Sequence, residues 1–224
     1  MTTGSPAVML RSLVRRAWMP LGCWLLLAGA LSARTIVLTD DDCPRMAAIA
    51  AEAPRLGWAA TEMSPGSFMT YYLDLIPTRG FLIYYPLDRI PKGQKVTNAE
   101  WEIPVSALSA GEPRLYVRRI VGDWGVGVCH EYRSVRPTKV PWNVPGAKGA
   151  SLDRALKPTA VVRMTAAGPC TINVTEDVQL WNSGAAANQG WILNVEDVDS
   201  LIRLNLPMYQ GRGQWKLRIT YEPE

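Results

Sequence analysis

The sequence predicts an all-β domain, a jelly-roll β-sandwich with a short N-terminal helix. Apolar and polar residues alternate with a period of two over residues 99–105 and 217–221, which is typical of half-buried antiparallel strands. Turns rich in Gly and Pro separate many short apolar runs, and no long helical period appears. This combination favours two packed sheets of short strands over a helical fold.

The first elements are a short strand and a helix. Residues 35–38 are apolar and β-branched, as in a strand, and acidic residues follow them at positions 40–42. Residues 44–53 then begin with Pro and are rich in Ala, Met and Glu, with Pro54 directly after them. This pattern predicts a helix over 44–53, with Asp41 or Asp42 as its N-cap.

The later elements are strands and one long loop. Residues 81–85 form a near-continuous apolar run, as expected for a strand that is covered on both faces. Further strands are predicted over 114–121 and 190–195, between turns that contain Gly, Pro and Asn. Residues 142–158 are predicted to form a long loop across one end of the sandwich.

The first 33 residues have the three parts of a secretory signal. Three arginines, at positions 11, 15 and 16, precede an apolar run over 17–30, and small residues follow at positions 32 and 33. The alternative is a membrane anchor, but this uncharged stretch is at or below the roughly 20 residues that a bilayer requires. We therefore expect one mature domain over residues 34–224 in a secreted or extracytoplasmic protein, with membrane contact only if the signal is retained.

The net charge of the mature domain is close to zero. The chain has 24 Lys and Arg against 20 Asp and Glu, and three of these arginines belong to the signal, which contains no acidic residue. Nucleic-acid binding requires a concentrated basic surface. The composition therefore does not predict a nucleic-acid partner.

Three cysteines remain after the signal: Cys43, Cys129 and Cys170. In an oxidising compartment two of them can pair, so at most one disulfide is expected, and its connectivity cannot be deduced from spacing. The spacing contains no C-x-x-C, which argues against a zinc site.

Four segments in sequence order resemble the DNRLRE family, which is also described as a family of disaggregatase-related, carbohydrate-binding modules. They are Gly80 to Leu87 with Ile90 to Gly93, Val96 to Ile103, the tryptophans 124 and 142 with Pro145-Gly146-Ala147, and Ile172 to Trp181 with Asn188 to Leu193. The similarity covers residues 80–221. It implies an extracellular jelly-roll sandwich, in a family often appended to enzymes that act on polysaccharides.

The sequence contains little that indicates catalysis. It has one histidine, His130, and neither a G-x-S-x-G motif nor a P-loop. A polysaccharide-degrading enzyme needs only two or three well-placed carboxylates or tyrosines. The nearby residues Asp123, His130, Glu131 and Tyr132 therefore stay a minor alternative.

Arginines and aromatic residues are the candidates for ligand binding. Arg114, Arg118, Arg133 and Arg136 can form a basic strip for an anionic polysaccharide, because guanidinium groups bind carboxylate or sulfate in a bidentate manner. The alternative is a solvated face with ion pairs to acidic neighbours. Tyr132 and Trp215 are the aromatic candidates for stacking on sugar rings, whereas Trp101, Trp124, Trp142 and Trp181 are expected in the core.

Asp40, Asp41 and Asp42, with Asp177 from elsewhere in the chain, can supply oxygen ligands to a structural calcium ion. The alternative is a charged turn that also caps a helix. No other cofactor is expected. Taken together, the sequence predicts a secreted, non-catalytic module that binds polysaccharide or a cell-surface component. The alternative is a structural protein of an envelope or matrix that binds only protein.

Overall fold

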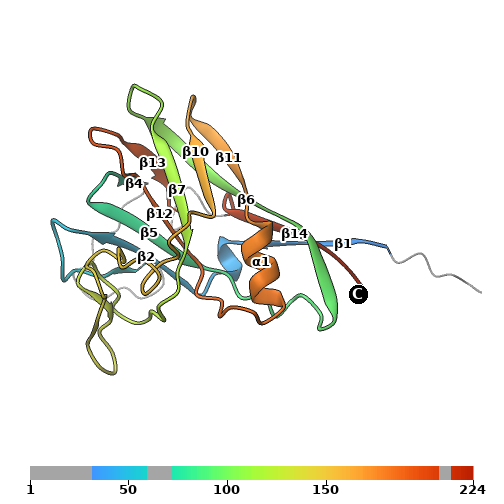
Figure 1. Ribbon diagram of the computed structural model, residues 1–224. Coiled ribbons are helices and arrows are strands. Elements are labelled where there is room, and N and C mark those ends of the chain that lie inside the picture. The colour runs from blue at the N-terminus through green and yellow to red at the C-terminus, as the bar shows by residue number, and fades with distance from the viewer. Residues whose placement is uncertain (1–31, 60–71, 207–212, 224) are drawn as a thin grey trace, which may run out of the picture. The chain divides into compact units, whose positions relative to one another are not determined.

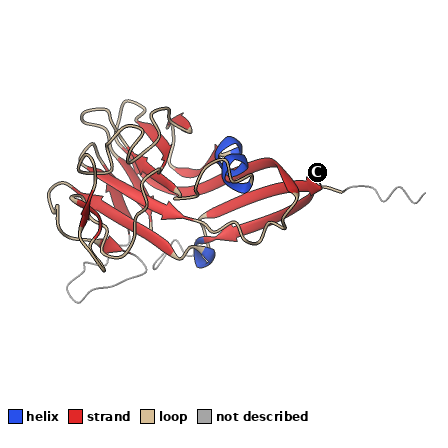
Figure 2. Cartoon of the chain, turned by 60° about the horizontal axis from the view of Figure 1, so that its bottom comes forward, coloured by secondary structure: helices blue, strands red, loops and turns tan. Residues whose placement is uncertain are grey.

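The computed structural model describes residues 32–59, 72–206 and 213–223, and within them the chain forms a sandwich of two sheets (Figure 1). Strands occupy much of this part of the chain, as Figure 2 shows. The predicted all-β sandwich is therefore confirmed. The predicted export signal lies almost entirely outside the described residues. No helix of the described residues is long and apolar enough to cross a membrane.

The first sheet, sheet A, is built around one long strand, β6 (Gln94–Leu108). One edge of β6 pairs with two strands in succession, and its other edge pairs with β11 (Gly168–Asn173). The strands on the first edge and their own neighbours are β14 (Lys216–Pro223), β1 (Arg34–Thr39), β13 (Ile202–Asn205) and β4 (Tyr72–Leu75). Every pairing is antiparallel.

The second sheet, sheet B, is also antiparallel. Its strands, in spatial order, are β10 (Ala160–Arg163), β7 (Arg114–Arg119), β12 (Trp191–Asn194), β5 (Arg79–Tyr84), β2 (Arg45–Ala50) and β3 (Trp58–Ala59).

The connectivity is that of a jelly roll. From β4 to β7 the chain alternates between the sheets, and it alternates again from β10 to β13. The eight strands are arranged as β4-β13-β6-β11 in one sheet and β5-β12-β7-β10 in the other, which is the eight-stranded, double Greek-key order. The remaining strands, β1, β2, β3 and β14, extend this framework.

Aromatic side chains fill the space between the sheets. Trp101 stacks on Trp191, with ring centroids 5.1 Å apart, and the ring centroid of Trp181 lies 4.6 Å from that of Trp191. Trp215 contacts both Trp101 and Phe81. All of these rings are buried, so most of the tryptophans of the described domain stabilise the sandwich by removing large apolar surfaces from water.

A second hydrophobic core lies on the outer face of sheet B. The segment between β7 and β10, which includes the short strands β8 (Tyr132–Ser134) and β9 (Val140–Pro141), packs on that face through Trp124 and Trp142. These rings cover Leu82 and Ile192 of sheet B. As predicted, β5 is covered on both faces. The loop predicted over residues 142–158, by contrast, belongs to a segment that lies on a sheet face.

The helix predicted over residues 44–53 is wrong, because residues 45–50 form strand β2. Its side chains are buried on both sides of the sheet, with Met46 and Ala48 in the central core and Ala47 and Ile49 in the second core. A strand covered on both faces is a continuous apolar run, which periodicity alone does not distinguish from a buried helix. Packing against β5 then outweighs the helix propensity of alanine.

The α-helix of the described chain lies elsewhere. Helix α1 (Thr175–Asn182) follows β11 and runs beside the edge of β6 that β11 leaves unpaired (Figure 1). Gln179 donates a hydrogen bond to the carbonyl of Val96, and Asn182 donates one to the carbonyl of Gln94. The side chains of α1 thus take the place of a neighbouring strand and protect the exposed edge of the sheet.

The three cysteines of the mature domain are free thiols, so the disulfide considered from the sequence is absent among the described residues. Cys43 donates to the carbonyls of Tyr84 and Arg45, at 2.9 and 3.3 Å. Burial is the main cause that raises its pKa to about 12. Cys129 and Cys170 are also buried, each within a different part of the fold.

Candidate functional site

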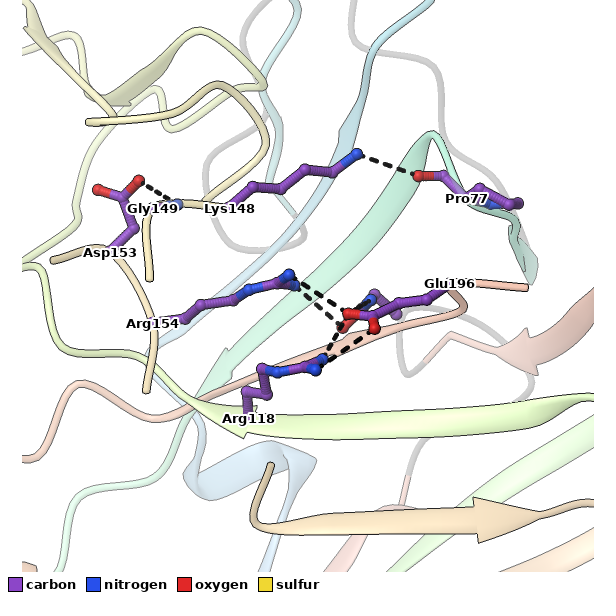
Figure 3. Close-up of polar contacts among 8 residues, drawn as sticks. Pro77, Arg118, Lys148, Gly149, Asp153, Arg154 and Glu196 are labelled. Carbon is purple, nitrogen blue, oxygen red and sulfur yellow. Dashed lines mark hydrogen bonds and ion pairs between the residues drawn. The ribbon is translucent and has the colours of Figure 1, made fainter. Parts of the chain in front are cut away.

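The outer face of sheet B carries a group of charged residues beside the second core. We call Arg118, Arg154, Asn194 and Glu196 the basic cluster, because two guanidinium groups in it meet one carboxylate (Figure 3). It borders the second core, and it is formed where the segment after β7 meets strands β7 and β12.

Strand alternation explains why these side chains point outward. Leu115 and Val117 of β7 are in the central core, so Arg114, Tyr116 and Arg118 lie on the opposite face. The register between β7 and β12 pairs Tyr116 with Asn194. The arginines of β7 therefore face the same surface as the polar end of β12.

The ion pairs of the basic cluster are close and shared. Nη1 of Arg118 lies 2.5 Å from Oε1 of Glu196, and Nη2 of Arg154 lies 3.3 Å from the same oxygen. Asn194 donates a third hydrogen bond to that oxygen, at 3.1 Å. The side chains of Arg118 and Arg154 are only 10% and 15% exposed. Two largely buried positive charges thus share one negative charge.

The electrostatics of the cluster follow from this imbalance. Burial lowers the pKa of Arg154, and the nearby charge of Arg118 lowers it further. Partial burial on its own raises the pKa of Glu196, but the hydrogen bond from Asn194 and the charge of Arg118 lower it, and its net shift is downward. The carboxylate is therefore ionised at neutral pH, and one positive charge of the cluster is not neutralised within it.

A buried carboxylate fixes the loop that carries Arg154. Asp153 accepts hydrogen bonds at 2.8–2.9 Å from the backbone of Asn143, Val144 and Gly149 and from the side chain of Asn143. Burial alone raises the pKa of Asp153, but these hydrogen bonds lower it, and the net pKa lies below its ordinary value. Gly149 is required here, because an added Cβ would overlap the Asp153 carboxylate.

The cluster continues along β7 toward an aromatic ring. Arg114 and Arg118 lie two positions before and two positions after Tyr116 in β7. Their guanidinium carbons are 5.7 and 5.1 Å from the centroid of the Tyr116 ring. Arg114 also forms a two-point hydrogen bond with Asp197. This surface therefore combines guanidinium groups with a partly exposed aromatic ring.

On the other side of the cluster, Lys148 donates to the carbonyl of Pro77 (Figure 3). A cavity of about 10 Å³ lies beside it, with Arg154, Asn194 and His130 in its lining. Such a volume holds about one water molecule. Burial lowers the pKa of His130, with a further contribution from Lys148. This cavity is therefore too small to hold a ligand larger than water.

The structure separates the residues predicted for ligand binding. It brings Arg114 and Arg118 to one face, as expected for a strip. Arg133 and Tyr132 lie on β8 and Arg136 lies beyond it, where Arg133 donates to the carbonyl of Asp123 and Lys139 sits over the Tyr132 ring. Trp215 is fully buried in the core, so its prediction as an exposed stacking residue is wrong. Its indole N–H donates to the carbonyl of Asn205.

Sequence reasoning missed Arg154, Glu196 and Tyr116. Arg154 lies in a segment without regular spacing, and Glu196 follows the end of β12. Tyr116 could have been found, because it lies midway between Arg114 and Arg118 in a predicted strand and so shares their face.

The residues considered for catalysis do not form a connected group. Glu131 pairs with Arg55, and Asp123 pairs with Arg45 at 3.7 Å. Among the described residues, His130 has no hydrogen bond to either carboxylate. The geometry gives a hydrolytic mechanism no support.

The aspartates considered for calcium have other partners. Asp40 accepts from the backbone of Gly213, and Asp42 accepts from the backbone of Thr39 and pairs with Arg89. Asp41 lies between them in a 3-10 helix, Asp40–Asp42. Asp177, on α1, accepts from the indole of Trp191 and the hydroxyl of Thr159. No group of three metal-ligating side chains occurs in the described parts of the chain, and the calcium site stays an untested prediction.

Comparisons with known proteins do not assign the chain to a family. No protein-family model matches the chain, and a search of curated proteins finds no match. The resemblance to the DNRLRE family therefore stays a prediction.

Proposed function

We propose that this protein is an exported, non-catalytic module that binds an acidic polysaccharide across the outer face of sheet B. The observation that carries the proposal is the basic cluster, in which two largely buried guanidinium groups share the carboxylate of Glu196. Carboxylate or sulfate groups of a polysaccharide complement the remaining positive charge and match the planar donors of arginine.

Two further features support a saccharide ligand. Tyr116 places an aromatic ring between Arg114 and Arg118, and such a ring offers a flat apolar surface to the C–H groups of a sugar. The site is an open surface with a cavity of only about 10 Å³ beside it, which suits a chain that is bound along its length. Export, predicted from the first 33 residues, would place the module among extracellular polysaccharides.

Affinity electrophoresis tests the proposal. Native gels that contain polygalacturonate, alginate or heparin should slow the purified protein, whereas a gel that contains neutral dextran should slow it much less. Added salt should reduce the retardation, because partly exposed charges are screened within about 10 Å at 0.1 M ionic strength. Unchanged migration in every acidic gel would overturn the proposal and favour the protein-binding alternative.

A further inference from the structure

A separate groove lies beside α1 and does not include any residue of the basic cluster. Its volume is about 890 Å³, within the range of roughly 300–1,000 Å³ that is typical of ligand sites. One wall is formed by the segment between β5 and β6 with the first residues of β6, and the other wall is formed by α1. It is therefore much larger than the cavity on sheet B and involves different elements.

Four exposed charged residues line this groove without partners. Asp88, Lys92 and Lys95 lie on the first wall, and Glu176 lies on α1. Within the described residues, the side chain of none of the four has a hydrogen bond or ion pair. The two positive and two negative charges balance, so these four side chains give the groove no net charge. Each group can still bind a hydroxyl, as a donor or an acceptor.

The floor of the groove combines an apolar surface with amide groups. Leu180 and Trp181 are among its apolar lining residues. The amide nitrogens of Gln179 and Asn182 donate to β6, which holds both side chains in place and leaves their amide oxygens with capacity to accept. Trp181 itself is buried, and its indole N–H has no acceptor in the described part of the chain.

The same contacts argue against a peptide that binds as an added strand. Such a peptide would hydrogen-bond to the free edge of β6. The carbonyls of Gln94 and Val96 on that edge are already occupied by the amides of α1. The groove thus presents side-chain groups, and not an open strand edge, to a ligand.

We propose that this groove is a second binding site, which takes an uncharged oligosaccharide. Balanced charges and amide oxygens suit the many hydroxyls of a neutral sugar, and the apolar floor suits its C–H faces. The proposal is independent of the function assigned to the basic cluster, because the two sites have no residue in common.

Titration of the purified full chain with cello-, manno- and xylo-oligosaccharides tests this proposal. The indole N–H resonance of Trp181, assigned with a Trp181→Phe variant, should shift in a saturable manner with at least one of them. Calorimetry should show that a double variant, Lys95→Ala with Glu176→Ala, binds this sugar about tenfold more weakly, a loss of about 1.4 kcal/mol. Both side chains are exposed and unpaired, so the variant should fold normally.

Two controls separate the two sites. Arg218→Ala removes an exposed charge of β14 on sheet A, outside the groove, and Arg154→Gln alters the basic cluster. Neither should change the affinity for the neutral sugar. The absence of a Trp181 shift with all three sugars, or equal affinity of the double variant, would overturn the proposal, as would displacement of the sugar by unrelated peptides.

Discussion

Asp153 links the hydrogen bonding of a loop to the position of Arg154. Its carboxylate accepts four hydrogen bonds from the residues that surround it, and the next residue supplies one guanidinium of the basic cluster. An asparagine amide at this position would present N–H groups to N–H donors. We expect Asp153→Asn to lower the free energy of unfolding by roughly 2–3 kcal/mol, measured by urea denaturation.

The same carboxylate should make stability depend on pH. Its pKa in the folded protein lies below the ordinary value of about 4. Its contribution is therefore complete above about pH 4 and is lost as the pH falls through the folded pKa. Between about pH 5 and pH 2, the unfolding free energy of the native protein should fall more steeply than that of Asp153→Asn. Parallel curves for the two proteins would contradict this role.

The thiol of Cys43 should be unreactive in the folded protein. Its pKa of about 12 leaves very little thiolate at pH 8, and the thiolate is the reactive form. Peptide mapping after iodoacetamide treatment at pH 8 should find Cys43 unmodified in the native protein and modified in guanidinium chloride. Rapid labelling of Cys43 in the native protein, or recovery of Cys43 in a disulfide, would contradict a buried, unreactive thiol.

Single residues also show what the sequence could predict of the site. Arg114 and Arg118 were found because a strand with a period of two places both on one face. Arg154 could not be found in this way, because no local pattern indicates that a loop residue contacts Glu196, which lies 42 positions later in the sequence. The prediction for Trp215 was wrong because β14 begins just after it, and burial there depends on the rings of Trp101 and Phe81 from other strands.

At the scale of elements, the clearest difference between expectation and structure is β2. Its apolar residues were predicted to be helical, because local propensity favours helix and alternation is absent. The second core, which buries the outer face of β2, includes Trp124 and Trp142, and both lie more than 70 positions away in the sequence. Strands with one wet face, such as β6 and β14, carry an alternating pattern and were predicted correctly.

Helix α1 gives a prediction at this scale. The double variant Gln179→Ala with Asn182→Ala removes the donors to the carbonyls of Val96 and Gln94. We expect a loss of roughly 1 kcal/mol for each hydrogen bond and faster hydrogen exchange in residues 94–99. Exchange mass spectrometry measures the second effect.

Ser183→Ala provides the matched control, because the hydroxyl of Ser183, the residue directly after α1, donates to the carbonyl of Leu180 and to no group of β6 among the described residues. It should leave exchange in β6 unchanged. If the double variant also left it unchanged, α1 would not be the element that protects this edge.

For the whole molecule, the jelly-roll order could be predicted as a class because many short strands and Gly-rich turns accompany an absence of helical period. The pairing of β6 with both β13 and β14 depends on contacts between distant segments. The second core also depends on contacts between segments that are distant in the sequence. It covers one part of sheet B, and the largely buried basic cluster lies at its border.

The central claim is that this border binds acidic polysaccharide. Calorimetric titration of oligogalacturonate into the native protein, Arg154→Gln and Arg218→Ala tests it most directly. Each variant removes one positive charge, Arg154→Gln from the basic cluster and Arg218→Ala from the exposed face of β14. We expect Arg154→Gln to weaken binding about tenfold or more, or about 1.4 kcal/mol, and Arg218→Ala to bind nearly as the native protein does. Equal losses for the two variants, or no measurable binding by the native protein, would contradict the account.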